Sequence, residues 1–268
     1  MSKIAFIGGG NMAAAIVGGL IADGVRPNDI TIVDPNATQR ARVQKELGVE
    51  TSDDTGTACK AADIIVLAVK PQVVPALAEQ IYAVTDLNGK LLISIAAGVT
   101  ISALEALFGD LAIARTMPNT PTLMGLGATS LYVNARTTEA QRKQAETIMG
   151  AIGICVPVER EELLDAVTAV SGSGPAYFFL LIEEMIRAGV TLGLSHDDAS
   201  KLTLQTALGA ASMAATRNVT PEELRRRVTS PNGTTHAAIT TLQEGGFGAL
   251  IDAALTACLD RAVELGQG

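Results

Sequence analysis

The stretch Ile4–Ala13, IAFIGGGNMA, decides the fold. Its first four residues are apolar and suit a short buried strand, and Asn11–Ala22 is a run of small and apolar residues that predicts a helix. Between them Gly8, Gly10 and Ala13 give the pattern G-x-G-x-x-A. The first glycine permits a tight turn, the second lets the backbone approach a pyrophosphate, and the alanine allows close packing of helix on strand. The stretch therefore predicts the first strand, turn and helix of a dinucleotide-binding domain, with phosphates at the helix N-terminus.

Strand and helix patterns alternate through the first half of the chain. Further strands are expected at Ile30–Val33, Ile64–Val69, Lys90–Ile95, Ala112–Arg115, Ala128–Val133 and Ile154–Val158, and helices at Ala37–Leu47, Val73–Tyr82 and Glu139–Met149. Alternation of this kind is typical of a parallel sheet with helices on both faces. The sequence thus predicts an α/β fold with a Rossmann-type, doubly wound sheet.

After Glu159 the strand patterns stop and helix-start signals replace them. Helices are expected to begin at Pro175, after the cap pair Ser195 and Asp198, and at the capping-box pattern Thr220–Glu223. We place the change of domain near residues 156–162. Residues 1–158 are expected to form the dinucleotide-binding Rossmann domain, and residues 159–268 an all-helical domain.

The charge balance excludes several classes of function. With 20 Lys+Arg against 28 Asp+Glu, the net charge is −8, and an acidic chain repels nucleic-acid backbones and anionic membranes. We therefore expect neither among its partners. Apolar runs such as Ile64–Val69 and Ala176–Ile182 are too short to cross a bilayer, and the chain starts without a leader pattern. The expected location is the cytoplasm.

The cysteines point to no metal site and no disulfide framework. Cys59, Cys155 and Cys258 are odd in number and far apart, and no pair has metal-ligand spacing. Buried, reduced thiols are expected.

Asp34 ends the second predicted strand, where an acid can accept hydrogen bonds from the ribose of an adenosine. It can equally be a turn-forming residue before Pro35. A carboxylate there disfavours an additional 2′-phosphate, and Arg40 and Arg42 are close enough in sequence to compensate. The choice between NAD and NADP therefore stays open on sequence grounds.

Two further segments follow later strands, at the sheet edge where ligands bind. They are Ala68, Val69, Lys70 and Pro71 after one strand, and Ile95, Ala96 and Ala97 after the next. Their small residues leave room for a ribose and a nicotinamide. Lys70 has two readings of similar weight, a solvated strand-end lysine or a direct cofactor contact.

The second half offers no convincing acid–base pair. His196 is expected in the first turn of a helix facing water, and His236 is a weak candidate. The pairs Glu161-Glu162 and Glu183-Glu184 have the pattern of a solvated boundary and a solvated helix face. The densest polar cluster is Val228–His236, VTSPNGTTH, which precedes a helix. It suits a carboxylate-binding pocket lined by amides, or else an ordinary capped loop.

The motifs of the chain together resemble those of the pyrroline-5-carboxylate reductase family, along almost the whole length. They are Ile7–Met12 (IGGGNM), Ala68–Pro71 (AVKP), Ser94–Gly98 (SIAAG), Met117–Pro121 (MPNTP), Val170–Tyr177 (VSGSGPAY) and Leu224–Leu242, which contains TSPNGTT. The resemblance implies reduction of 1-pyrroline-5-carboxylate to L-proline with NADPH or NADH. It also implies a helical dimerisation domain that interlocks with that of another subunit.

The resemblance implies roles for individual residues. Ile7, Gly8, Gly9, Gly10, Asn11, Met12, Ala68, Val69, Lys70, Pro71, Ile95, Ala96 and Ala97 line the cofactor, with Asp34 beside them. Ser230, Gly233, Thr234 and Thr235 hold the substrate: the amides of Gly233 and Thr234 suit its carboxylate, and the Thr235 hydroxyl lies near the ring nitrogen. Thr235 and Ser230 are thus the expected catalytic residues. No metal is expected.

Two departures and two alternatives accompany this resemblance. Asn232 stands where many members have a second glycine, which stiffens the loop, and Asp34 stands where members that prefer NADPH often carry a small or hydroxyl residue. One alternative is a reductase of another imine or of a β-hydroxy acid; the latter needs a lysine, and Lys201 is the only lysine after Lys143. The other is a non-catalytic dinucleotide sensor, for which a divergent TSPNGTT segment would be expected.

Overall fold

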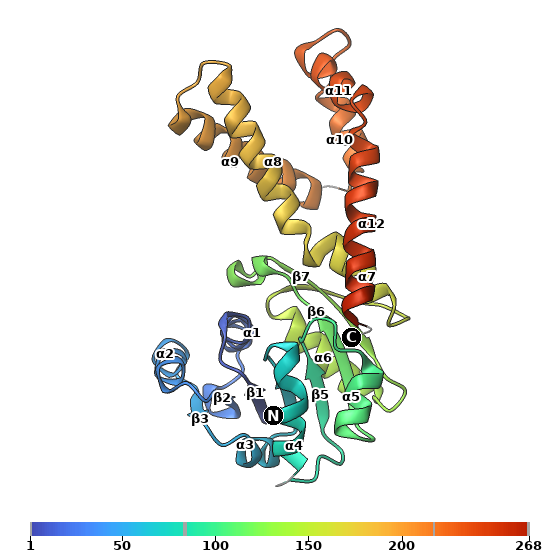
Figure 1. Cartoon of the computed structure of the whole chain (residues 1–268). Coiled ribbons are helices and arrows are strands. Elements are labelled where there is room, and N and C mark those ends of the chain that lie inside the picture. The colour runs from blue at the N-terminus through green and yellow to red at the C-terminus, as the bar shows by residue number, and fades with distance from the viewer. Residues whose placement is uncertain (1, 83–84, 217, 267–268) are drawn as a thin grey trace. The chain divides into compact units, whose positions relative to one another are not determined.

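The strand Ile4–Ile7 lies inside a mixed sheet (Figure 1). In the computed structural model, which describes residues 2–82, 85–216 and 218–266, eight strands are ordered β3-β2-β1-β4-β5-β6-β7-β8. They are β1 (Ile4–Ile7), β2 (Ile30–Val33), β3 (Glu50–Ser52), β4 (Ile64–Leu67), β5 (Leu91–Ser94), β6 (Ala112–Met117), β7 (Gly127–Val133) and β8 (Gly153–Pro157). Strands β1 to β6 are parallel, but β7 is antiparallel to β6 and β8 is parallel to β7. The expectation of a parallel sheet is therefore wrong for the last two strands.

Helices connect and follow these strands. They are α1 (Asn11–Ala22), α2 (Ala37–Leu47), α3 (Thr55–Ala61), α4 (Val74–Tyr82), α5 (Ile101–Phe108), α6 (Glu139–Gly150), α7 (Leu163–Val167), α8 (Gly174–Thr191), α9 (His196–Thr216), α10 (Pro221–Arg227), α11 (Thr234–Glu244) and α12 (Phe247–Gly266). Short 3-10 turns occur at Pro27–Asp29, Pro71–Val73 and Thr120–Met124, and a π-helical turn at Thr168–Gly172. The patterns of the sequence did not indicate β3, α3 and α5, which are short.

The apolar side chains form one core on each face of the sheet. Alternate residues of β1 divide between them: Ile4 and Phe6 pack in the cluster that α1, α2 and α6 cover, while Ala5 and Ile7 pack in the cluster that α3, α4 and α5 cover. Because successive side chains of a strand point to opposite faces, an all-apolar strand implies two covered faces. The sheet is doubly wound, as predicted.

Hydrogen bonds from side chains set several helix ends. Asn36 caps α2 through the Thr38 amide at 2.9 Å, and Ser195 caps α9 through the Asp198 amide at 3.1 Å. At α10 only half of the expected capping box forms, since Thr220 accepts from the Glu223 amide at 3.3 Å. The Glu223 carboxylate instead binds the guanidinium groups of two arginines in the next turn, Arg226 and Arg227. These bonds lower the pKa of Glu223 to about 2.

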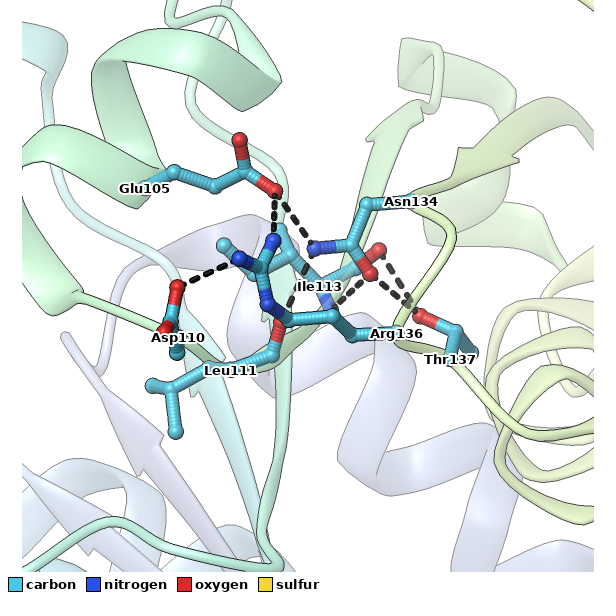
Figure 2. A network of polar contacts seen from close by, with 7 residues as sticks. All are labelled: Glu105, Asp110, Leu111, Ile113, Asn134, Arg136 and Thr137. Carbon is cyan, nitrogen blue, oxygen red and sulfur yellow. Dashed lines mark hydrogen bonds and ion pairs between the residues drawn. The ribbon is translucent and has the colours of Figure 1, made fainter.

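A polar network fixes the reversal of β7 at the amino edge of the parallel strands (Figure 2). The side chain of Asn134 is buried. Its Oδ1 accepts hydrogen bonds from the Ile113 backbone amide at 3.1 Å and from the Thr137 hydroxyl at 2.9 Å. Its Nδ2 donates to Glu105 Oε1 at 2.9 Å and to the Leu111 carbonyl at 2.8 Å. All four of its hydrogen-bonding positions are used, so the register of β7 on β6 is tied to this one residue.

All three cysteines are free thiols, but the expected burial holds only for Cys59, because Cys155 and Cys258 are half-buried. Burial raises the pKa of the Cys59 thiol to about 12, and burial with the nearby Glu146 carboxylate raises that of Cys155 to about 11. The thiolate is the reactive form, so neither residue is suited to redox chemistry near neutral pH.

By its internal contacts the described chain divides into two compact units. The first comprises residues up to Ser173 together with those from Cys258 onward, and the second is Gly174–Ala257. This division falls later than the expected change near residues 156–162. The reason is that α7 and the π-helical turn pack on β6 and β7, so they belong with the sheet.

The second unit buries very little of its own surface. Among its described residues only Gly174, Ala199 and Thr203 are buried. Large apolar side chains of α8 and α9 are exposed instead, among them Phe178, Phe179, Leu180, Leu202, Leu204 and Leu208. A helical unit without a core of its own needs a partner surface to be stable.

Taken as one helical run, residues Leu163–Thr191 are long and apolar enough to cross a membrane by length and composition, which the separate apolar runs of the sequence did not indicate. Its mean hydropathy is 1.2, and only 11% of the apolar window is buried. A helix whose apolar face packs against another subunit has these same properties, so the run is weak grounds for a membrane span.

We predict that Phe179→Glu dissociates the assembly, because it places a charge on the exposed apolar face of α8. Burying that unpaired charge at a cost of roughly 3 kcal/mol would weaken association about a hundredfold. Light scattering at low micromolar concentration measures the effect, with Tyr82→Glu in α4 of the first unit as the matched control. A wild-type chain that is a folded monomer would contradict the account.

Candidate active site

The turn after β1 brings two backbone segments into direct contact. Gly8 has φ +104° and donates its amide hydrogen to the Val33 carbonyl at 2.7 Å. A Cβ added to Gly8 would lie 2.4 Å from the Ala68 carbonyl oxygen, so no other residue fits. Gly10 differs, since its φ is −64° and no atom lies within 4 Å of an added Cβ. Nothing in the described chain requires glycine at position 10, but in the pattern G-x-G-x-x-A a glycine there lets a pyrophosphate approach the backbone.

The N-terminus of α1 offers unpaired donors beside Gly10. The first amide with a helical partner is that of Ala14, which donates to the Gly10 carbonyl at 3.0 Å. Within the described residues the amides of Asn11, Met12 and Ala13 have no acceptor, and Gly10 caps the helix without a side chain. Unpaired amides at the positive end of a helix dipole suit a pyrophosphate.

Asp34 supports this glycine turn from β2. Its Oδ2 accepts the Gly9 amide at 2.9 Å, and its Oδ1 accepts the Asn36 amide at 2.8 Å. Both readings of the sequence are thus compatible: the residue shapes the turn, and its carboxylate oxygens keep lone pairs for further donors.

The two nearby arginines are already engaged by the protein. Arg40 donates to the Asp34 carbonyl at 2.7 Å and pairs with Asp53 at 3.1 Å. Arg42 pairs with Glu46 at 3.4 Å and lies 3.5 Å from the Gly9 carbonyl. Both therefore lie at the rim of the glycine turn, where a 2′-phosphate would need a cation.

The two later cofactor segments reach the same edge of the sheet. The Ala68 amide donates to the Ile7 carbonyl at 2.8 Å, and the Ile95 amide to the Leu67 carbonyl at 3.2 Å. Lys70 is exposed at the start of the 3-10 turn Pro71–Val73. The structure thus brings the residues predicted to line the cofactor together at the carboxyl ends of β1, β2, β4 and β5.

A cavity of about 260 Å³ opens beside these segments in the first unit. It is lined by Pro71, Gln72, Ala96, Ala97, Gly98, Arg115, Thr116, Met117, Leu164, Asp165, Thr168, Ala262 and Leu265. Only Pro71, Ala96 and Ala97 of this lining were predicted. Gln72 and Gly98 adjoin the predicted segments, and the others come from the end of β6, from α7 with its π-helical turn, and from the last turns of α12.

Arg115 anchors one wall of this cavity. The side chain is nearly buried and pairs with Glu161 at 2.7 Å and with Asp165 at 3.6 Å. Glu161 also accepts the Ile101 amide, at 2.7 Å. The expectation that Glu161 is merely solvated is therefore wrong. The sequence does not indicate this pairing, because Arg115 and Ile101 are far from Glu161 along the chain.

The predicted substrate residues all lie in the second unit, around the start of α11. Ser230 and Thr234 are exposed, and Gly233 and Thr235 are half-buried. The Gly233 amide is not available to a ligand, since it donates to the Ser230 carbonyl at 3.0 Å. The amides of Thr234, Thr235 and His236 have no acceptor among the described residues, so of the two amides predicted for a carboxylate only that of Thr234 is free.

The backbone conformation of Asn232 accounts for the presence of asparagine at this position. Its φ is +59°, the only positive value of a non-glycine among the described residues. Asparagine tolerates this left-handed conformation better than other non-glycine residues do. It therefore preserves the turn in which a glycine would serve.

The remaining candidates are exposed, although only His196 is expected to face water. His196 begins α9 and is exposed, and His236 is exposed in the first turn of α11. Lys201 is exposed and pairs with Asp197 at 2.6 Å, which leaves the β-hydroxy-acid alternative without support. No group of three or more metal-ligating side chains occurs within the residues that the structure describes.

Comparison with known proteins agrees with this geometry. Residues 161–265 match the family model of pyrroline-5-carboxylate reductase dimerisation, and residues 3–98 match that of coenzyme F420-dependent NADP oxidoreductases. A pyrroline-5-carboxylate reductase of Pseudomonas aeruginosa is 50% identical over 266 residues, which cover 99% of this chain and 97% of the relative. The chain belongs to the pyrroline-5-carboxylate reductase family.

Solved structures of the family have the same fold. The pyrroline-5-carboxylate reductase of Coxiella burnetii has a TM-score of 0.95 at 42% identity, covering 98% of each chain. The Plasmodium falciparum enzyme, solved with NADP bound, has a TM-score of 0.85 at 30% identity and covers 99% of this chain and 98% of its own. Pyrroline-5-carboxylate reductases are oxidoreductases, and the helical segment of this chain is the family's dimerisation region.

We predict opposite effects for alanine at two glycines of the turn. Gly10→Ala should leave the free energy of unfolding within about 0.5 kcal/mol of wild type and weaken dinucleotide binding ten- to a hundredfold, roughly 1.4–2.8 kcal/mol. Gly8→Ala should destabilise the fold by about 3 kcal/mol or more, because its Cβ meets a backbone carbonyl. Denaturant unfolding and titration of NADPH fluorescence measure both quantities. Unchanged NADPH affinity in Gly10→Ala would show that no ligand approaches the turn.

Proposed function

We propose that the chain reduces 1-pyrroline-5-carboxylate to L-proline with NADPH or NADH, in the cytoplasm. The observation that carries this proposal is the glycine turn: Gly10 is open where the chain itself needs no glycine, next to unpaired amides of α1. Membership of the pyrroline-5-carboxylate reductase family supports the choice of substrate.

The residues at the carboxyl edge of the sheet fit a nicotinamide dinucleotide. Gly8 to Met12 would hold the pyrophosphate, Asp34 the adenosine ribose, and the segments Ala68–Pro71 and Ile95–Ala97 the remainder. When bound, the reduced nicotinamide supplies the hydride. The cavity beside Ala96 and Ala97, at about 260 Å³, would receive the nicotinamide ring.

The loop before α11 would hold the substrate. The amides of Thr234, Thr235 and His236 suit its carboxylate, for the same reason that helix N-termini bind anions. Ser230 and the Thr235 hydroxyl are left to orient the ring and to donate to its nitrogen. An imine is readily protonated in water, so the chain needs no dedicated acid, in agreement with the solvated histidines.

Self-association belongs to the same proposal. Residues 159–268 would serve both substrate binding and dimerisation, because the exposed apolar faces of α8 and α9 need a covering surface and the family model of dimerisation matches there. A dimer, or a larger assembly of dimers, is the working form.

The direct test is oxidation of NADPH and of NADH by the purified protein, followed by absorbance with and without 1-pyrroline-5-carboxylate. Substrate-dependent oxidation with stoichiometric proline is the expected result. No oxidation with either cofactor, in a protein that is folded and binds NADPH, would overturn the proposed function.

We predict that Asp34→Ser raises the ratio of kcat/KM for NADPH to that for NADH. Removing a carboxylate from the vicinity of a 2′-phosphate relieves a repulsion of roughly 1–2 kcal/mol, which is about a tenfold change in preference. Both absolute efficiencies should fall, because the Gly9 and Asn36 amides lose their acceptor.

Asp34→Asn is the matched variant, since it removes the charge and keeps one acceptor oxygen. If neither substitution raises the relative efficiency of NADPH, Asp34 acts only as a support for the glycine turn.

For catalysis we predict that Thr235→Ala lowers kcat by roughly ten- to a few-hundredfold, a loss of about 1.5–3 kcal/mol. The hydroxyl donates to a ring nitrogen whose electron density rises along the reaction, so the bond strengthens in the transition state. Unfolding and NADPH binding should change little, because the cofactor residues lie in the other unit.

Thr234→Ala is the control for this prediction, because Thr234 is assigned a role through its backbone amide alone. Equal losses in the two variants, or full turnover in Thr235→Ala, would mean that Thr235 has no part in the reaction beyond starting α11.

A further inference from the structure

Two sequence motifs remain without a role in the function proposed above. One is Met117–Pro121, MPNTP, which begins at the last residue of β6. The other is Val170–Tyr177, VSGSGPAY, which begins inside the π-helical turn Thr168–Gly172. The two are about fifty residues apart in sequence, yet in the first unit they are in direct contact.

Asn119 makes the polar part of this contact. Its side chain is almost completely buried, at 8% exposure. Its Nδ2 donates to the Ser171 carbonyl in the π-helical turn at 3.0 Å, and its Oδ1 accepts the Ala128 amide of β7 at 2.9 Å. One amide group therefore ties the end of β6, the start of β7 and the π-helical turn together.

Met117 and Gly172 make the apolar part. A Cβ added to Gly172 would lie 2.6 Å from Met117 Cε, so the glycine leaves the space that the methionine side chain occupies. Met117, from the first motif, and Thr168, from the π-helical turn, both line the cavity. The place of Met117 beside this turn is thus set by the Asn119 bond and by the absence of a side chain at position 172.

The π-helical turn is itself unusual. The Ser173 amide donates to the Thr168 carbonyl at 2.8 Å, five residues back, and such turns are rare and frequent at functional sites. The Ser171 carbonyl has no helical donor four residues on, because Pro175 lacks an N–H, and it accepts from Asn119 instead.

We propose that Asn119 is a positioning residue for the reaction, which together with Gly172 holds Met117 and Thr168 in place in the cavity lining. The inference rests on the proposed function, in which this cavity receives the nicotinamide. Misplacement of reacting groups by about an ångström lowers rates by up to a hundredfold, so a wall held by one buried amide is a sensitive point.

The adenosine end of the cofactor should be insensitive to the Asn119 side chain. The link from this segment to the glycine turn runs through Thr122, whose hydroxyl donates to the Asn119 carbonyl at 2.8 Å and lies 3.4 Å from Met12 Sδ. That link uses the Asn119 backbone, which every substitution retains.

The first test compares Asn119→Asp with Asn134→Asp in the full-length protein. The carboxylate introduced at position 119 keeps an acceptor for the Ala128 amide but turns its other oxygen toward the Ser171 carbonyl. Asn134 is equally buried and fully bonded, at the opposite edge of the same strands, so its variant controls for loss of stability (Figure 2). We measure kcat, KM for the substrate, NADPH Kd, the free energy of unfolding, and hydrogen exchange of residues 163–173.

Asn119→Asp should lower kcat about ten- to a hundredfold, with NADPH Kd changed less than threefold and faster exchange in residues 163–173. Asn134→Asp should lose stability and keep kcat at temperatures where it is folded. Equal effects on kcat in the two variants, with an active wild type, would overturn the positioning role. An inactive wild type would overturn the proposed function instead.

A second variant separates positioning from folding altogether. Gly172→Ala displaces only the flexible end of Met117, so its free energy of unfolding should stay close to wild type while kcat falls about tenfold or more. Gly174→Ala is the matched control, because an added Cβ there has no atom within 4 Å. Full turnover in Gly172→Ala would contradict the inference.

Discussion

Two peptide groups meet where β1 and β4 end, and the rest of the site depends on how closely they do so. The Ala68 carbonyl would lie 2.4 Å from any Cβ at Gly8, so the turn can form only with glycine in this left-handed conformation. This glycine turn leaves the first amides of α1 without partners. Asp34, next to β2, stabilises the turn by accepting the Gly9 amide. A site for phosphates thus arises from backbone alone, which suits a chain with a net charge of −8.

The two edges of the sheet divide stability and function between them. At the amino edge Asn134 satisfies all its hydrogen bonds within the network that reverses β7. At the carboxyl edge Asn119 has a similar burial but joins segments that line a cavity. The second unit presents an exposed apolar surface, and it lies within the segment that matches the family model of dimerisation.

The local parts of this structure could be predicted from the sequence, and the long-range parts could not. Strand β1 and helix α1 have the predicted bounds because their apolar periods and the glycines between them act over a few residues. The reversal of β7 and the pairing of Arg115 with Glu161 depend on partners more than ten residues away, so no local pattern indicates them. No pattern indicates the strand β3, because its three residues, Glu50–Ser52, are all polar and show no alternation of apolar and polar side chains. In the loop before α11 the candidate residues followed from the family resemblance. The sequence did not indicate that the Gly233 amide bonds the Ser230 carbonyl within the turn, which leaves the amides of Thr234, Thr235 and His236 free.

The proposed reaction moves a hydride from C4 of the reduced nicotinamide to the imine carbon of 1-pyrroline-5-carboxylate. Transfer of isotope tests it most directly: the protein is supplied with 1-pyrroline-5-carboxylate and NADH or NADPH deuterated at C4 of the nicotinamide, and the product is analysed by mass spectrometry and NMR. Proline that carries a single deuterium at Cδ, the former imine carbon, is the predicted result. Oxidised cofactor with unlabelled proline, or no proline at all from a folded protein that binds the dinucleotide, would contradict it.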